Sequence, residues 1–169
     1  MPRPTPAESA PFYHFYISLA TGDEVQDVLR QSLPSLEDFL LLINSEKAGY
    51  AYAPGKWSLA QLLQHLIDTE RVFAYRAMCF ARGEEQPLPG FDENRYAAHA
   101  AGALRSWHQL VQELILLRRC TIMLFEGLSP VELGRTGIAS DHPITVNALG
   151  FIMVGHVLHH FQVITERYL

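Results

Sequence analysis

The sequence contains little cysteine: its two thiols, Cys79 and Cys120, lie far apart in the chain. Neither belongs to a C-x-x-C motif, and two cysteines are too few for the disulfide framework of a small secreted domain. Both lie within apolar helical patterns, where free cysteine usually behaves as a small buried hydrophobic residue. We therefore expect two buried thiols and no disulfide scaffold.

A concentration of basic residues is also absent. The formal net charge is −5, and Lys and Arg form no cluster along the chain. Because a protein that binds nucleic acid needs a basic surface to neutralise phosphates, we expect no nucleic-acid partner.

Long hydrophobic runs are absent as well, since the apolar stretches are short and interrupted by charged residues or histidine. We therefore expect no transmembrane segment and no membrane partner. The proline-rich first six residues match neither a signal peptide nor the start of a helix. They predict a frayed, extended start to an N-terminal arm over residues 1–20, and we place the protein in the cytoplasm.

Several catalytic motifs are missing too. The chain has no G-x-S-x-G motif, no glycine-rich phosphate-binding loop, no H-E-x-x-H motif and no C-x-x-C-H haem attachment. We therefore set aside the chemistries that these motifs carry, and we disfavour haem.

What the sequence does contain is helical periodicity. Of its 169 residues, 49% are hydrophobic, enough for one domain with a sizeable core. Apolar residues recur every three or four positions in four segments, and no alternating pattern indicates a strand. We expect long helices over residues 23–44, 58–82, 103–126 and 145–169, short helices near 94–100 and 129–132, and loops over 83–93 and 134–143.

Local signals mark where these helices begin and end. Ser58 and Thr145 are good N-caps, and Gly83 is the residue type that most easily takes the left-handed conformation after a helix. Pro34 interrupts the first apolar stripe without changing its phase, which predicts a kink within one helix. Together these features predict an all-α protein, with a single four-helix bundle over residues 21–169.

Three histidines are the candidate functional residues. His156 and His160 are four positions apart on the last predicted helix, so their rings lie on one face and can bind the same divalent cation. His65, at the edge of the apolar seam of the second helix, can supply a third imidazole. Three such ligands leave a coordination position open, as in catalytic zinc sites. His159 is also a helical neighbour of His156, and spacing alone does not exclude it.

Asp68 is a further candidate, three residues after His65 on the same side of the second helix. Its carboxylate can orient a ligand imidazole, serve as a fourth ligand or act as a general base. The alternative is a solvated carboxylate that pairs with Arg71, three residues further along.

These residues belong to longer motifs. Gly-Lys-Trp-Ser at 55–58 leads into Gln-His-Leu-Ile-Asp-Thr-Glu at 64–70, and the chain closes with Gly-His-Val-Leu-His-His at 155–160 and Glu-Arg-Tyr-Leu at 166–169. In this order and at these separations, the motifs resemble those of the DinB-like (damage-inducible, YfiT-like) family of metal-dependent enzymes. The resemblance covers nearly the whole chain.

The resemblance implies a four-helix bundle, often homodimeric, in which one histidine of the second helix and two of the last hold a divalent metal. In this chain the matching residues are His65, His156 and His160, which favours His160 over His159. Members of the family include metal-dependent hydrolases and S-transferases that use low-molecular-weight thiols. In many relatives Arg-Gly-Gln follows the last histidine, whereas Phe-Gln-Val does here, so no substrate role passes to Gln162.

Two classes of function follow. The first is a hydrolase or thiol S-transferase that acts on a small molecule and uses zinc or nickel, with iron, copper or manganese as alternatives. The second is a non-catalytic stress-response or scaffold protein whose metal site is structural or empty. The aromatic segment at residues 12–16 forms too large an apolar patch to stay in water. We expect it to pack on the bundle or on the second subunit of a homodimer.

Overall fold

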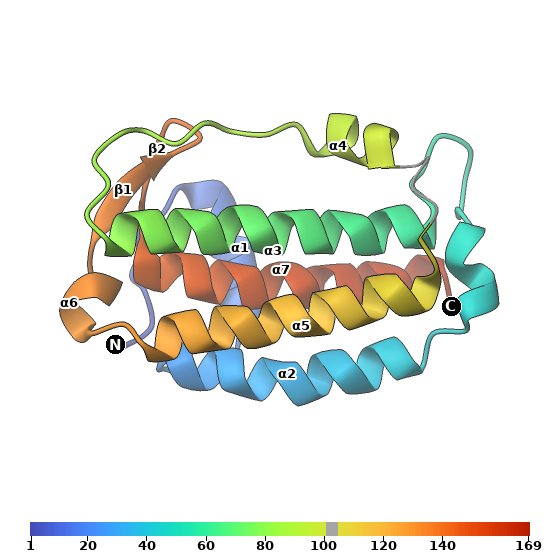
Figure 1. Cartoon of the computed structure of the whole chain (residues 1–169), viewed down its shortest axis with the longest axis horizontal. Helices are drawn as coiled ribbons and strands as arrows, with labels where there is room; N and C mark the ends of the chain where they lie inside the picture. Colours follow the sequence, from blue (N-terminus) through green and yellow to red (C-terminus); the bar gives the residue numbers. More distant parts are fainter. Residues whose placement is uncertain (101–104) are drawn as a thin grey trace.

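Four long helices lie side by side and form the body of the molecule (Figure 1). The computed structural model describes residues 1–100 and 105–169. α2 and α3 each pack against both α5 and α7, so α2 and α3 occupy opposite corners of the bundle. The predicted all-α four-helix bundle is confirmed. Its helices are α2 (Val25–Leu41), α3 (Leu59–Ala81), α5 (Trp107–Glu126) and α7 (Val146–Arg167).

The ends of the helices follow the local signals in the sequence. The Ser58 hydroxyl accepts a hydrogen bond from the backbone N–H of the third residue of α3 at 3.2 Å, and Thr145 caps α7 in the same way at 3.0 Å. Gly83 follows α3 with a φ of 84°, in the left-handed region that favours glycine. Pro34 lies inside α2, which continues through it.

The third long helix differs from its predicted range. α5 begins at Trp107 because Ser106 caps it, and the Gln109 side chain accepts a hydrogen bond from the Ser106 N–H at 2.9 Å. The predicted start at residue 103 lies outside the described residues. The short helices α4 (Glu93–Ala100) and α6 (Pro130–Leu133) lie where the sequence predicted them.

A two-stranded antiparallel hairpin takes the place of the loop predicted over residues 134–143. β1 (Thr136–Ala139) pairs with β2 (His142–Thr145) around a two-residue turn at Ser140 and Asp141. Both turn residues have positive φ, 51° and 66°, as in the tight turns that match the twist of paired strands. The strands are too short for alternation to be recognised, and the turn lacks glycine, so neither usual signal was present.

The N-terminal arm is packed on the bundle, as expected for its aromatic segment at residues 12–16, whereas the prediction that the proline-rich first six residues are frayed was wrong. Two short 3₁₀ turns lead into α1 (His14–Leu19), which packs along α7. This approach depends on Gly155 of α7, because a Cβ there would lie 1.8 Å from the backbone carbonyl oxygen of Tyr16. Close packing of two backbones is a tertiary property that a proline-rich composition does not reveal.

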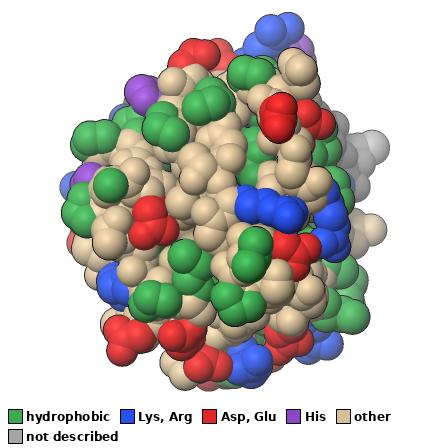
Figure 2. All heavy atoms as spheres, turned by 90° about the vertical axis from the view of Figure 1, so that its left-hand side faces the viewer, with side chains coloured by type: hydrophobic (Ala, Val, Ile, Leu, Met, Phe, Trp, Pro, Cys, Tyr) green, Lys and Arg blue, Asp and Glu red, His purple; other side chains and the backbone are tan. Residues whose placement is uncertain are grey.

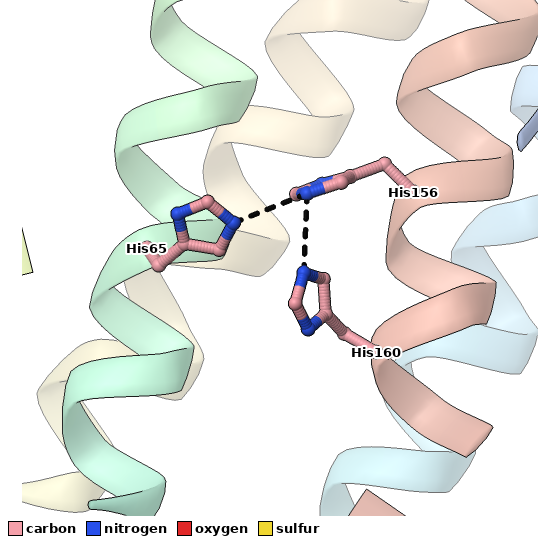
Figure 3. Close-up of side chains that lie close together, drawn as sticks. All are labelled: His65, His156 and His160. Carbon is pink, nitrogen blue, oxygen red and sulfur yellow. Dashed lines mark hydrogen bonds between the residues drawn. The ribbon is translucent and has the colours of Figure 1, made fainter. Parts of the chain in front are cut away.

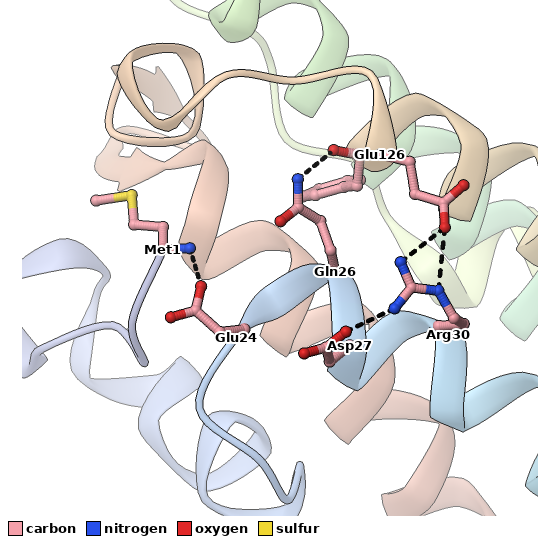
Figure 4. A network of polar contacts seen from close by, with 7 residues as sticks. Met1, Glu24, Gln26, Asp27, Arg30 and Glu126 are labelled. Carbon is pink, nitrogen blue, oxygen red and sulfur yellow. Dashed lines mark hydrogen bonds and ion pairs between the residues drawn. The ribbon is translucent and has the colours of Figure 1, made fainter.

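Polar contacts hold the start of the chain in place. The side-chain amide of Asn147 donates a hydrogen bond to the carbonyl oxygen of Pro2 at 2.8 Å. The amino group of Met1 contacts the carboxylate of Glu24, just before α2 (Figure 4). The arm is therefore attached to both the first and the last helix of the bundle.

α7 is the central helix of the hydrophobic core, and every residue from Val146 to Val157 is buried. By length and composition alone α7 is apolar enough to cross a membrane, contrary to the expectation from the sequence, but one such helix is weak evidence, and 67% of its most apolar 18 residues are buried inside the bundle. A helix that is apolar on all sides is typical of a protein core as well as of a membrane span.

The surface is mixed in character at one end of the bundle. Figure 2 shows acidic, basic and apolar side chains interspersed at the end of the bundle that carries α6 and the hairpin. Cys120 is exposed on α5 and Cys79 is half-buried on α3, so the prediction of two buried thiols was wrong. The outward side of α5 also exposes Leu116 and Met123, and this apolar outer stripe explains why periodicity misplaced Cys120.

Candidate metal centre

The three predicted histidines meet at one point between two neighbouring helices. His65 projects from α3, and His156 and His160 project from successive turns of α7 (Figure 3). The Nε2 atoms of His65 and His156 are 3.1 Å apart, and those of His160 and His156 are 3.2 Å apart. One ligand atom from each of the three rings lies within 4.8 Å of the others.

This arrangement fits a single divalent cation. With metal–nitrogen bonds of about 2.1 Å, two ligand nitrogens of a tetrahedral site lie about 3.4 Å apart. The two shorter separations in the cluster are close to that value without any rearrangement of the helices. Three imidazoles also leave a position free for water or substrate.

Burial keeps the imidazoles neutral at pH 7. It lowers the pKa of His65 to about 4, against a smaller opposing effect from the charge of Glu93. Burial, together with the charges of His65 and His159, lowers the pKa of His160 to about 3. The pKa of His156 lies well below its usual value, first because of burial and then because of the neighbouring imidazoles. Neutral imidazole is the form that binds metals.

Aromatic side chains pack around the cluster. The ring of Trp57 lies 5.0 Å from that of His65, and the ring of Tyr16, from α1, lies 5.4 Å from that of His156. Nδ1 of His160 is buried and has no hydrogen-bond partner among the described residues. Metal-binding histidines usually donate this second N–H to an acceptor. Because the described residues provide no acceptor for Nδ1 of His160, packing sets the orientation of its ring.

The histidines line a cavity of about 400 Å³, a size typical of small-molecule sites. Arg76 and Glu93 are the charged residues of its lining other than histidine. The N-terminal segment forms part of the wall, a role that the sequence did not indicate. The aromatic residues of the wall are Phe12, Tyr13, Tyr16, Trp57, Phe73 and Phe91.

Asp68 is not brought to the cluster. Its Oδ1 accepts a hydrogen bond from the side-chain amide of Gln64 at 2.9 Å, and Asp68 is not part of the cavity lining. The predicted alternative partner, Arg71, contacts Glu113 instead. A catalytic role for Asp68 stays a prediction, and the residue would act from outside the cavity.

His159 has a different environment from the three clustered histidines. It lines the cavity, but its ring packs against those of Phe15 and Tyr16, with centroid separations of 5.6 Å in both cases. The ambiguity that helical spacing left between His159 and His160 is therefore answered by geometry: the converging nitrogen belongs to His160.

Sequence reasoning missed the charged and aromatic residues of the wall. Arg76 continues the apolar seam of α3 after Phe73, and a basic residue in such a seam was an available signal. Tyr16 and Glu93 carried no such signal, because they reach the cavity only through tertiary packing.

The histidine geometry agrees with the family that the motifs resemble. The sequence model of the DinB superfamily matches residues 23–164. The chain belongs to the DinB superfamily. The matched range contains all three histidines and nearly the whole bundle, and it leaves out the N-terminal arm. No curated protein matches the chain in sequence.

Solved structures of other proteins share this DinB fold. YfiT from Bacillus subtilis, described as a probable metal-dependent hydrolase, matches with a TM-score of 0.71 and 19% identity over 96% of this chain and 89% of its own. A mycothiol-dependent maleylpyruvate isomerase matches with a TM-score of 0.66 and 14% identity over 88% of this chain. This chain covers only 59% of the isomerase. At such identities the likeness shows a common fold.

Proposed function

We propose that this protein is a metal-dependent enzyme that acts on a small molecule. The observation that carries the proposal is the convergence of the ring nitrogens of His65, His156 and His160 beside a cavity. Three neutral imidazoles suit zinc and nickel first, and they also accept iron, copper or manganese.

In this proposal the chain's own residues bind and orient the reactants. The three histidines would hold the metal beside the cavity that they line. A divalent metal bound there would supply Lewis acidity and lower the pKa of a water or thiol nucleophile. The aromatic walls exclude bulk water and orient an apolar substrate against the histidines. Glu93 is the carboxylate of the cavity lining that would accept the released proton.

Two reactions use such a nucleophile: hydrolysis if it is water, and S-transfer if it is a low-molecular-weight thiol. YfiT is described as a probable metal-dependent hydrolase and the other protein as a mycothiol-dependent isomerase, so proteins of this fold include a probable hydrolase and an enzyme that depends on a small thiol. A second cavity, of about 280 Å³, also has Trp57 and His160 in its lining. Because two cavities border the same histidine, the site has room for a thiol and an electrophile together, and we favour S-transfer.

Elemental analysis of protein purified without added metal or an affinity tag tests the metal. We expect roughly one divalent ion per chain, bound by the three histidines. Glutathione with 1-chloro-2,4-dinitrobenzene then reports S-transfer, and p-nitrophenyl acetate reports hydrolysis. Turnover that is lost on chelation and restored by metal supports the enzyme. A tightly held metal without turnover of either probe favours the structural or scaffold protein, and protein without metal contradicts the proposal.

A further inference from the structure

Two arginines are buried in the bundle, and they differ in what surrounds their charge. Arg118 forms an ion pair with Glu70, and the two side chains are 0% and 2% exposed. Arg76 is also only 2% exposed, but it has no carboxylate partner among the described residues. Its Nη2 donates to the carbonyl oxygen of Pro89 at 2.8 Å and to Oγ of Ser140 at 2.9 Å, and both acceptors are neutral. A buried cation without a counterion is unfavourable.

The surroundings of Arg76 fix its position without neutralising it. Its guanidinium lies 5.5 Å from the centroid of the Phe73 ring, in a cation–π arrangement. Ser140, which accepts from it, lies in the hairpin turn at a positive φ. Burial lowers the pKa of Arg76 from its ordinary value, yet an arginine side chain stays charged at neutral pH. The Tyr13 hydroxyl is a further hydrogen-bonding neighbour of the guanidinium, and because burial raises the pKa of Tyr13 it too is neutral at pH 7.

Arg76 and the histidines line the same cavity. Arg76 lies eleven residues after His65 on α3, which is about three helical turns and about 16 Å along the axis, on the same face. Thr69 and Phe73 lie between them on that face and also line the cavity. The charge of Glu93 acts to raise the pKa of His65, but it is not among the causes that shift the pKa of Arg76. The cavity therefore has an unneutralised cation well separated from the histidine cluster.

We propose that Arg76 binds an anionic group of the substrate. The substrate is then an elongated molecule with a carboxylate or phosphate at the Arg76 end and an apolar body along the aromatic wall. Its reacting group lies at the histidines, and this placement of the reacting group rests on the proposed function. The planar guanidinium presents paired N–H donors, which match the paired oxygens of a carboxylate or phosphate.

The proposal is tested by calorimetric binding of three matched probes to the full-length protein: phenylhexanoic acid, its primary amide and the corresponding phosphonic acid. Metal-free and metal-loaded samples are both used, so that binding of the acid to a metal is recognised. We expect the wild type to prefer an anionic probe over the amide by at least about tenfold. The tighter of the two acids identifies the group as carboxylate or phosphate.

Three variants make the test specific. Arg76→Gln should lose the preference for the anion, and Arg76→Lys should keep a reduced preference because the charge remains without the planar fork. Arg82→Gln is the control, because it removes one positive charge from the residue after α3. The Arg82 side chain is 62% exposed and pairs with Glu132. This variant should therefore prefer the anionic probe as strongly as the wild type does. Thermal melts check folding, and Arg76→Lys supplies the comparison if Arg76→Gln does not fold.

Equal binding of acid and amide by the wild type, or an unchanged preference in a folded Arg76 variant, overturns the inference. Metal analysis of the same samples separates this failure from that of the proposed function. An Arg76-dependent preference in a protein that never binds metal supports the anion site and removes the metal proposal. A metal-binding protein without the preference removes the anion site alone.

Discussion

The guanidinium of Arg118 and the carboxylate of Glu70 form two parallel hydrogen bonds inside the bundle, Nε to Oε1 at 2.8 Å and Nη2 to Oε2 at 2.9 Å. Arg118 also donates to Oγ of Ser32 at 2.6 Å and to the carbonyl oxygen of Met153 at 3.3 Å. This residue of α5 thus contacts α3, α2 and α7. Because Met153 lies one turn before His156, the pair helps to set the position of α7 against α3.

Replacing Glu70 by Leu should leave the buried charge of Arg118 without a partner. We expect a loss of about 3–5 kcal/mol in the free energy of unfolding, measured by urea denaturation. The matched control is Glu37→Leu, which breaks the exposed Arg119–Glu37 pair and should cost less than about 1 kcal/mol. Equal losses in the two variants would contradict a structural role for the buried pair.

His156→Ala should abolish metal binding and any metal-dependent activity together, while the helical fold persists. The apolar surfaces of four helices, and not the metal, supply most of the burial in a chain of this size. His159→Ala is the control for metal binding, because its ring lies outside the converging cluster. Metal content, activity and thermal melts are measured for both variants. A collapse of the fold in His156→Ala or in chelated wild type would indicate a structural metal.

The metal-free protein should lose stability as the pH falls from 7 to 4. The pKa values of His65 and His160 are lowered to about 4 and about 3 in the folded protein, whereas the same histidines in the unfolded chain have a pKa near 6.5. Between these values the unfolded chain binds more protons, so acid favours unfolding by up to about 1.4 kcal/mol per pH unit for each histidine. Urea denaturation across this range should be less pH-dependent in His65→Gln, and identical slopes would refute the assignment.

Gly155→Ala should displace α1 from α7, because the new Cβ would overlap the carbonyl oxygen of Tyr16. We expect a loss of about 1–3 kcal/mol in the free energy of unfolding, and faster hydrogen exchange in α1. Gly49→Ala serves as the control, since no heavy atom lies within 4 Å of its new methyl group. The same exchange rates in both variants would show that α1 does not depend on this contact.

The homodimer stays a prediction that the structure leaves to experiment. Phe12 and Phe15 are 54% and 52% exposed on the docked arm, so part of the aromatic segment remains available to a second subunit. Sedimentation at micromolar concentration should give a dimer, and Phe15→Ser should weaken it. Leu42→Ser, at a residue 75% exposed elsewhere, should not. A strict monomer would count against the prediction.

The helices could be predicted because their signals are local. Ser58 and Thr145 cap the helices that they were expected to cap, and Gly83 ends α3 in the left-handed conformation. The apolar seams and the i, i+4 pair His156 and His160 follow from the helical repeat, which depends on neighbours within a few residues. Local patterns wrongly predicted that Cys120 is buried, because an apolar stripe on α5 faces outward.

The sequence by itself therefore determined the bundle, the helix ends marked by Ser58, Gly83 and Thr145, and the residue types able to bind a metal. Only the tertiary structure decided that α3 packs on α7, so that His65 meets His156, and that the N-terminal arm closes one wall of the cavity. It also decided that Glu70 neutralises Arg118 while Arg76 remains without a carboxylate. These outcomes depend on contacts between segments far apart in the chain, and the free energy of such contacts leaves no periodic or capping signal in the local sequence.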